Sequence, residues 1–272
     1  MPNSTDLWYR AFETQDYELF RQACSRFREE PNSQVAADNS RWFHLPAIAD
    51  HGLLRDEPHD QYKDCKISVL VVGYSRPEGA IRATTSAMVT AARPDLLDIK
   101  VCTDVSDPLV QRYTALPETE VHVCESHRTS DKWNYMYDRC TGEIIVLVCD
   151  DVIFRGWGWD DFLRRFWPHD GLAVVNATGP CLLEFPIVSR TMTEKLGYAV
   201  PPEITHSGLD TFWSYIGVEL GRYYFTPERV RIDHHHYETT IVHNRQTRYA
   251  SPHEVSPQRL REIALTAANR LR

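Results

Sequence analysis

The segment of residues 143–151, Glu-Ile-Ile-Val-Leu-Val-Cys-Asp-Asp, most constrains the fold of this chain. Its apolar residues follow one another without polar alternation, which is typical of a strand buried on both faces of a parallel sheet. Ligands of such sheets bind at the carboxyl ends of the strands, where Asp150 and Asp151 stand. The sequence therefore predicts a buried central strand that ends in a carboxylate pair.

The carboxylate pair has two interpretations. Two carboxylates can hold a hard divalent cation, and Mg²⁺ or Mn²⁺ bound by carboxylates and phosphate oxygens is the usual arrangement in nucleotide chemistry. Alternatively, the dipeptide only ends the strand and caps the next turn, because a motif this short has low specificity. Both interpretations stay open on the dipeptide alone.

Strand and helix patterns alternate along the middle of the chain. Residues 67–72 predict a second buried strand, which a Gly-Tyr-Ser-Arg-Pro turn follows. Strands and helices in this order predict right-handed crossovers and a doubly wound, mostly parallel α/β sheet. The other predicted elements are a helix at 78–92, a strand at 98–103, a strand at 120–124 and a helix at 131–140.

We expect three parts in the chain. Residues 1–65 carry aromatic and charged residues at roughly helical spacing, which predicts a helical N-terminal extension. Residues 66–245 contain no internal repeat or Gly/Ser linker and are interpreted as one catalytic domain. Residues 246–272 are interpreted as a C-terminal helical tail, because Ser256 suits an N-cap and Pro257 suits the first helical position.

Charge, hydropathy and cysteine usage limit the cellular compartment and the partners that we expect for this chain. A net charge of −8 over 272 residues provides no global attraction to nucleic acid or anionic membrane. No apolar run reaches the roughly 20 residues that span a bilayer, and no leader pattern opens the chain. The seven cysteines form no Cys-x-x-Cys pair, which favours free thiols in a reducing compartment. We therefore expect a cytoplasmic protein without a membrane partner.

Several motifs together carry a resemblance to a known family. Residues 67–78 (ISVLVVGYSRPE), 101–104 (VCTD), 132–134 (KWN) and 147–152 (LVCDDV) resemble, in their order and spacing, a family-2-type glycosyltransferase with the GT-A fold. They match its nucleotide-sugar half, which would span residues 66–155. The segments HSGLDTFW at 206–213 and RIDHHH at 231–236 resemble the acceptor half, residues 156–245. The small glycosyltransferases of bacteriophages are the members that the chain resembles most.

The resemblance implies a Rossmann-like GT-A domain and an inverting hexosyl- or pentosyltransferase. The donor would be a nucleoside-diphosphate sugar, with UDP as the favoured nucleotide, and the cofactor would be Mn²⁺ or Mg²⁺. Asp151 would bind the metal directly, while Asp150 would bind the ribose or the metal through water. Cys149 departs from the family motif, which often has Asp at that position. A phage enzyme would act in the host cytoplasm.

A run of three histidines is the second source of metal ligands. In an extended segment His234 and His236 point to the same side. The resemblance implies that one histidine completes the metal sphere, with His236 preferred over His234. Alternatively, the run is a solvated loop. A three-histidine iron or zinc site is disfavoured, because three consecutive side chains do not easily converge on one ion.

Asp210 is the candidate general base. By its match to the family position ahead of an aromatic helix, it would remove the proton from the acceptor hydroxyl. Partial burial would raise the pKa of such a carboxylate towards working pH. The alternative is an N-cap of a helix at 211–220, a position that Asp favours. The two roles are compatible.

The resemblance also suggests residues for the donor pocket. Asp104, after the second strand, would pair with the uracil or guanine base, and the turn after the first strand would line the same pocket. A surface or capping role is the alternative for each of them. The turn residues are Gly73, Tyr74 and Arg76, and the residues expected at the ribose or diphosphate are Lys132 and Asn134.

The sequence does not identify the acceptor of the sugar. Trp157, Trp159 and Trp167 could form a stacking platform or simply pack in the core. The phage resemblance points to a hydroxymethylated base in DNA, for which the Arg-rich C-terminal helix with Arg245 and Arg248 could bind phosphate. A solvated helix face, and a glycan, protein or small-molecule acceptor, are the alternatives.

Two other functions are compatible with the Asp pair. A nucleotidyltransferase also binds metal beside a parallel sheet, but it would need a Gly-rich basic signature that Gly-Tyr-Ser-Arg-Pro matches poorly. A non-catalytic nucleotide-binding module is the other alternative, and it would leave Asp210 and His236 without a role.

Overall fold

The computed structural model describes residues 22, 58, 60–114, 119–177, 185–205, 208–225, 230–234 and 255–272. The predicted N-terminal extension, residues 1–65, lies almost wholly outside these ranges. His236, Arg245 and Arg248 lie outside them as well.

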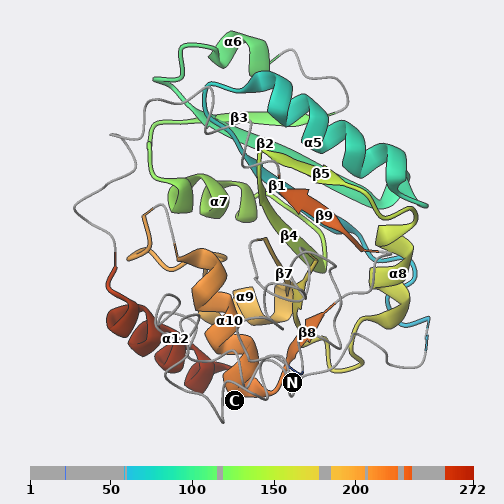
Figure 1. Cartoon of the computed structure of the whole chain (residues 1–272), viewed down its shortest axis with the longest axis vertical. Helices are drawn as coiled ribbons and strands as arrows, with labels where there is room; N and C mark the ends of the chain where they lie inside the picture. The colour runs from blue at the N-terminus through green and yellow to red at the C-terminus, as the bar shows by residue number, and fades with distance from the viewer. Residues whose placement is uncertain are drawn as a thin grey trace.

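The described residues form a central sheet in the strand order β3-β2-β1-β4-β7-β6-β8 (Figure 1). β1 runs parallel to β2 and β4, and β2 runs parallel to β3, so the predicted mostly parallel α/β sheet is confirmed. β7 is antiparallel to both β4 and β6, which the sequence patterns did not predict. The strands are β1 Ile67–Val72, β2 Leu97–Asp104, β3 Glu120–Cys124, β4 Ile144–Cys149, β6 Val174–Asn176, β7 Pro186–Ser189 and β8 Tyr223–Phe225.

Helices cover both faces of the sheet, which explains the unbroken apolar runs of β1 and β4. Val69 and Val71 pack in one core with α5, whereas Leu70 and Val72 pack in a second core with α7, α9, α10 and α12 (Figure 1). The helices are α5 Pro77–Thr90, the 3₁₀ turn η2 Pro94–Leu96, α6 Val110–Tyr113, α7 Thr129–Tyr137, α8 Trp159–Phe166, α9 Arg190–Leu196, α10 Leu209–Leu220 and α12 Pro257–Leu271.

The C-terminal helix is part of the core rather than a tail. Ser256 caps α12 by accepting a hydrogen bond of 3.2 Å from the Arg259 backbone N–H, as its sequence predicted. Leu260, Ile263 and Leu271 of this helix are buried against the core that α10 and α7 share. The interpretation of residues 246–272 as a separate tail therefore does not describe this helix, because its apolar residues pack against α10 and α9 and belong to the core.

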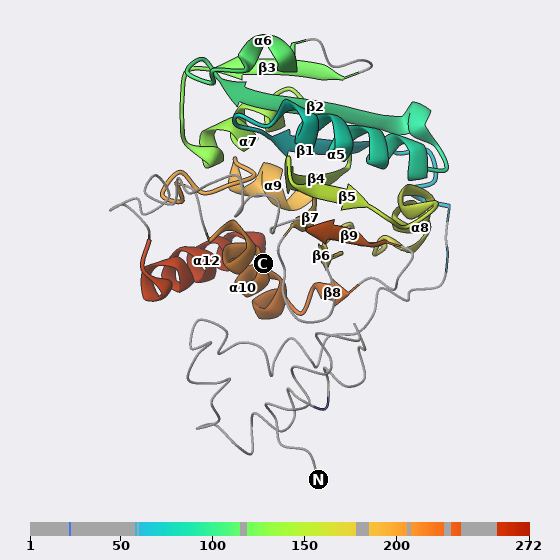
Figure 2. The same cartoon turned by 45° about the horizontal axis from the view of Figure 1, so that its top comes forward.

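Two short strands form a second, antiparallel sheet beside α5 and α8 (Figure 2). They are β5 Val152–Phe154 and β9 Ile232–His234. Val152 pairs with His234, so the end of β9 lies next to the residues that follow β4. The described cysteines are free thiols, as predicted: Cys65, Cys102, Cys124, Cys140 and Cys149.

Candidate functional site

The predicted carboxylate pair lies at the carboxyl end of β4, beside the start of α5. Asp150 is fully buried and Asp151 is 8% exposed. Arg76 precedes α5, and its guanidinium pairs with both: Nη2 contacts Asp150 Oδ1, and Nη1 lies 3.2 Å from Asp151 Oδ2. Gly79 makes this approach possible, because a Cβ there would overlap the carbonyl oxygen of Asp150.

The two carboxylates differ in their electrostatic environment. Burial raises the pKa of Asp150 to about 7; Arg76 lowers this pKa and the neighbouring Asp151 raises it further. Burial also opposes ionisation of Asp151, but the hydrogen bond with His234 and the charge of Arg76 outweigh it and lower its pKa. Asp151 is therefore held ionised, while Asp150 titrates near neutral pH.

His234 reaches the carboxylates through the pairing of β5 with β9. Its Nε2 lies 3.4 Å from Asp151 Oδ2, and its ring packs edge-on against Phe185 with centroids 5.0 Å apart. Asp151 Oδ1 is buried and accepts no hydrogen bond within the described residues. A buried carboxylate oxygen of this kind beside an imidazole fits a divalent cation. In the described ranges no three metal-ligating side chains converge, and His236 lies beyond them.

The turn after β1 is held by three consecutive backbone N–H groups. Tyr74 N–H donates to Asp150 Oδ2 at 3.2 Å, Ser75 N–H to Asp107 Oδ2 at 2.7 Å, and Arg76 N–H to Tyr113 Oη at 2.9 Å. Ser75 has a φ of +57°, an uncommon value for a residue with a side chain. These bonds hold the strained turn, and with it Arg76, in position.

Sequence reasoning missed Asp107 and Tyr113. Asp107 stands in a Ser-Asp-Pro segment that is typical of a turn, and Tyr113 carries no local pattern that would mark it. The Tyr113 hydroxyl also contacts Asp150 Oδ2 at 3.4 Å, and its ring lies against Gly73, where a Cβ would come within 2.7 Å of it. Gly73, assigned to the donor pocket, therefore has a packing reason to be glycine. Asp107 is buried, which its turn-like sequence does not indicate.

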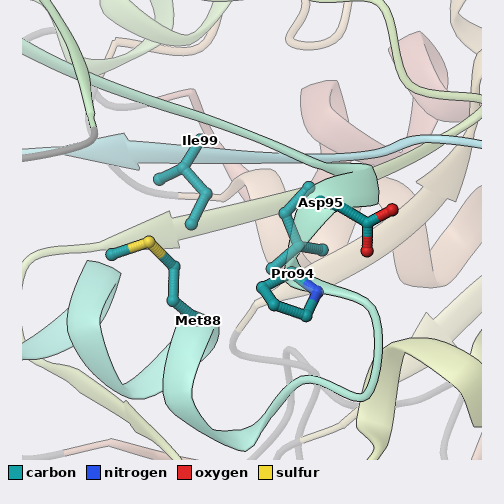
Figure 3. Close-up of a pocket in the computed structure, with 5 residues that line it drawn as sticks. Met88, Pro94, Asp95 and Ile99 are labelled. Carbon is teal, nitrogen blue, oxygen red and sulfur yellow. The ribbon is translucent and has the colours of Figure 1, made fainter.

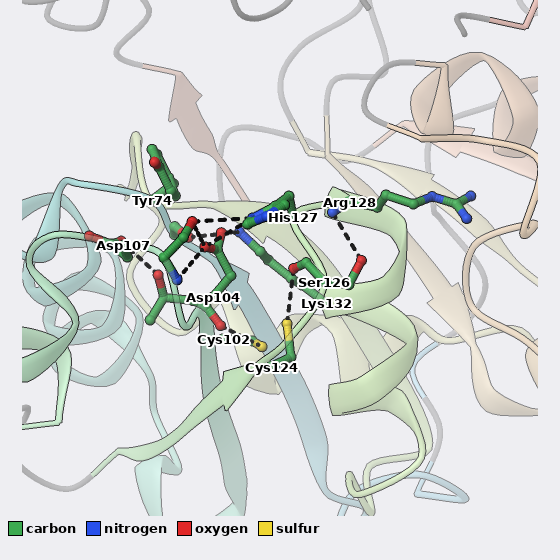
Figure 4. Close-up of polar contacts among 12 residues, drawn as sticks. Tyr74, Cys102, Asp104, Asp107, Cys124, Ser126, His127, Arg128 and Lys132 are labelled. Carbon is green, nitrogen blue, oxygen red and sulfur yellow. Dashed lines mark hydrogen bonds and ion pairs between the residues drawn. The ribbon is translucent and has the colours of Figure 1, made fainter.

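A second polar cluster lies at the carboxyl end of β2 (Figure 4). Lys132 Nζ binds Asp104 Oδ2 at 2.7 Å and lies 5.4 Å from the centre of the Tyr74 ring. Asp104 Oδ1 accepts hydrogen bonds from the backbone and hydroxyl of Ser106 and contacts His127 Nδ1 at 3.3 Å. Burial alone would raise the pKa of Asp104, but Lys132 and Ser106 outweigh it and lower the pKa. The predicted residues Asp104, Lys132 and Tyr74 thus come together.

Asn134 points away from this cluster. Its side-chain nitrogen donates to the Val200 carbonyl at 2.7 Å, and its oxygen accepts from the backbone N–H groups of Ala199 and Val200. These bonds tie α7 to the segment that follows α9. They give Asn134 a structural role in place of the expected contact with ribose or diphosphate.

Asp210 lies half-buried in the first turn of α10. The N-cap of this helix is Gly208 with a φ of +103°, so the alternative of a capping role for Asp210 is wrong. The Cδ2 atom of Leu260 would lie 3.1 Å from a Cβ at Gly208, which means that α12 packs directly against the start of α10. The core helix α12 therefore fixes where Asp210 sits.

Comparisons with known proteins give a structural match but no sequence match. No protein-family model matches the chain, and no curated protein matches it. The structure is similar to the mannosyltransferase PcManGT from Pyrobaculum calidifontis in complex with GDP-Man and Mn²⁺, with a TM-score of 0.56 and 13% identity over 94% of this chain and 85% of that chain. The chain has the GT-A fold. The resemblance to bacteriophage enzymes receives no support from these comparisons.

Another similar structure is S. aureus TarS 1–349 in complex with UDP, at a TM-score of 0.47 and 14% identity. The match covers 62% of this chain and 60% of that chain.

Trp157, Trp159 and Trp167 do not form one platform. Trp159 and Trp167 are buried in the core under α5. Trp157 is 75% exposed, and the next residue, Gly158, donates to the Thr90 carbonyl at the last residue of α5. Because α5 begins at the carboxylates and extends away from them, Trp157 lies at the far end of the helix. The expectation of an acceptor platform is therefore wrong.

A pocket of about 300 Å³ opens between α5 and the start of β2 (Figure 3). It is lined by Met88, Pro94, Asp95, Leu97 and Ile99. Asp104, at the other end of β2, belongs to the polar cluster, so this pocket is separate from the candidate site.

The expected arginine face of α12 is partly neutralised. Arg259 pairs with Glu262 at 3.2 Å, and Arg272 pairs with Glu219 at 2.6 Å. Among the described helices, none is long and apolar enough to cross a bilayer.

Proposed function

We propose that this protein is a metal-dependent glycosyltransferase that moves a sugar from a nucleoside-diphosphate sugar to an acceptor hydroxyl. The observation that carries the proposal is the buried pair Asp150–Asp151, faced by Arg76 and His234, at the carboxyl end of β4 in a GT-A fold. The PcManGT complex with GDP-Man and Mn²⁺ supports this donor class and this kind of cation. We favour a UDP-sugar on the resemblance of the nucleotide-sugar half.

Asp151 and His234 are the described residues that would hold Mn²⁺ or Mg²⁺, with His236 as the further predicted ligand. When bound, the cation would offset the negative charge that develops on the leaving diphosphate. Asp150 is fully buried and accepts a hydrogen bond from the Tyr74 N–H, so its direct effect is to fix the turn after β1. Its proposed contact with ribose or metal would involve water.

The polar cluster around Asp104 is proposed to receive the base and ribose. The buried Asp104–Lys132 pair orients the ammonium under the Tyr74 ring, which offers an aromatic face beside a charged group. Both carboxylate oxygens of Asp104 already have partners, so the nucleobase of the donor would compete with Ser106 or be bound through it. The Gly73 carbonyl borders the same region, at 3.5 Å from Lys132 Nζ, whereas the Arg76 side chain lies at the carboxylate pair.

The transfer step is proposed to proceed with inversion. Asp210 accepts the proton of the acceptor hydroxyl while the oxygen of that hydroxyl forms a bond to the anomeric carbon. The bond from that carbon to the diphosphate oxygen breaks, and its electron pair leaves with the nucleoside diphosphate. Attack from the side opposite the leaving group inverts the anomeric configuration. A half-buried carboxylate suits the role of base.

The acceptor is proposed only as a hydroxyl group. A hydroxymethylated base in DNA is one candidate, and transfer to hydroxymethylated against unmodified duplex tests it directly. The paired arginines of α12 and the net charge of −8 make strong, salt-sensitive DNA binding an unexpected result.

The test is a thermal-shift screen of UDP- and GDP-sugars with and without Mn²⁺, combined with analysis of the products. We expect stabilisation by one nucleotide family that needs the metal, since a ligand at 100 times its Kd adds about 2.7 kcal/mol. Asp151→Asn should lose this effect, whereas Asp64→Asn, at an exposed site on the chain leading to β1, should retain it. Release of a nucleoside diphosphate supports sugar transfer, and release of pyrophosphate would point to nucleotidyl transfer. No stabilisation by any donor contradicts the proposal.

A further inference from the structure

Arg76 occupies the place at the carboxylate pair that a cation would need. Its guanidinium contacts Asp150 Oδ1 through Nη2 and lies 3.2 Å from Asp151 Oδ2 through Nη1. The same Oδ2 lies 3.4 Å from His234 Nε2. A metal bound by Asp151 and His234, through Oδ1 or Oδ2, would therefore share the carboxylate of Asp151 with the guanidinium. Two positive groups at such a separation repel each other strongly, even with partial screening.

The backbone of Arg76 is held by contacts that do not involve its side chain. Its backbone N–H is held by Tyr113 Oη at 2.9 Å, and Pro77 starts α5 immediately after it. Its side chain is 24% exposed, whereas that of Asp150 is fully buried. Rotation of the Arg76 side chain towards solvent would free the carboxylates without breaking these backbone contacts.

We propose that Arg76 is an internal counter-ion that competes with the divalent cation for Asp150 and Asp151 and transfers to the diphosphate of the incoming donor. This inference rests on the proposed function. A guanidinium binds phosphate oxygens in a bidentate manner, so the diphosphate offers Arg76 a partner in exchange for the carboxylates. Metal binding is then weak without nucleotide, because only the fraction of molecules with Arg76 displaced is competent. Nucleotide and metal each strengthen the binding of the other.

The test measures Mn²⁺ affinity by the EPR signal of free Mn²⁺, with and without UDP or GDP, on the full chain. Arg76→Gln should bind Mn²⁺ at least about tenfold more tightly than the wild type when nucleotide is absent. The tightening of Mn²⁺ binding by the nucleotide should be smaller than in the wild type. Arg76→Lys keeps the positive charge and should remain close to the wild type without nucleotide.

Arg93→Gln is the matched control, because it removes the same charge beyond the other end of α5. Arg93 pairs with the exposed Asp95 at 3.0 Å, away from the carboxylate pair. The Mn²⁺ affinity of the Arg93→Gln variant should equal that of the wild type. If Arg76→Gln does not fold, Asp150→Asn with and without Arg76→Gln replaces it, and the double variant should bind nucleotide-free Mn²⁺ more tightly.

The possible failures can be told apart. In the first, the wild type binds Mn²⁺ with UDP or GDP, while Arg76→Gln binds Mn²⁺ no more tightly than the wild type without nucleotide. That result overturns the counter-ion role alone. The same role is overturned if Arg76→Lys binds as tightly as Arg76→Gln. Absence of Mn²⁺ binding by wild type and variants, with either nucleotide, overturns the proposed function as well.

Discussion

At the scale of single residues, the candidate site depends on side chains that hold other groups in position. Tyr113 and Asp107 bind backbone N–H groups of the turn that carries Arg76, and Asp150 binds a third. All three are buried, so none of them is replaced by water at low cost. Tyr113 and Asp107, which lie outside the carboxylate pair, therefore help to set the orientation of the Arg76 guanidinium at the carboxylates.

Tyr113→Phe tests this arrangement. The change removes the hydroxyl that accepts from the Arg76 N–H and contacts Asp150, and leaves the ring that packs on Gly73. We expect a loss of about 1–3 kcal/mol in the free energy of unfolding, because a buried N–H loses its partner. Denaturant unfolding measures it. Tyr135→Phe, at a partly exposed position on α7, is the control, and an equal effect in both would contradict the argument.

A pH effect is expected from His122 on β3. Burial lowers the pKa of this histidine below 6.5, although Glu120 raises it. The unfolded chain therefore binds a proton more readily than the folded one, so the stability contribution is complete above pH 6.5 and is lost as the pH falls through the folded pKa.

His122→Gln should flatten this dependence. Between about pH 7.5 and about pH 5.5, the variant should lose less unfolding free energy than the wild type. Denaturant titrations at both pH values give the difference. An identical pH dependence in the two proteins would show that His122 does not couple to folding.

At the scale of elements, α5 and β4 meet at a glycine. Gly79 lies in the first turn of α5, directly against the carbonyl of Asp150. The sequence marks the start of this helix by Pro77, which suits the first helical position. The close approach of the helix to the strand end is what brings Arg76 onto the carboxylates.

Gly79→Ala separates helix propensity from packing. In an open helix this change would stabilise by about 1 kcal/mol. Here we expect destabilisation by about 1–3 kcal/mol, because the new methyl group overlaps the Asp150 backbone. Thr85→Ala, on the exposed face of the same helix, should have a small effect. A stabilised Gly79→Ala protein would contradict the close packing of α5 on β4.

At the scale of the whole molecule, the described C-terminal helix completes the domain. α12 contributes buried residues to the core beneath α10 and α7, and its Leu260 packs on Gly208 at the start of α10. The position of Asp210 thus depends on a segment about 50 residues further along the chain.

Leu260→Ala should therefore affect both stability and the candidate site. We expect a loss of about 2–4 kcal/mol in unfolding free energy, since a buried leucine is replaced in a packed core. Glu262→Ala, exposed on the same helix, is the control. Thermal and denaturant unfolding compare them, and equal stabilities would mean that α12 is the tail its sequence first suggested.

The sequence alone determined the buried parallel strands, the helices that connect them and the strand end that carries the carboxylate pair. Unbroken apolar runs predicted the buried strands β1 and β4, and Ser256 predicted the start of α12, because these signals are local in the chain. The placement of Asp150 and Asp151 at a strand end followed for the same reason. The short antiparallel strands β6 and β7 were missed, since three or four residues carry too little periodicity.

Only the tertiary structure decided which distant side chains meet. The β5–β9 register brings His234 to Asp151, and the short helix α6 brings Tyr113 to Arg76, across separations that local patterns do not encode. It also placed Trp157 at the far end of α5 from the carboxylates. The physical reason is that a residue pattern specifies backbone conformation and burial, whereas convergence at a site depends on strand register and loop path.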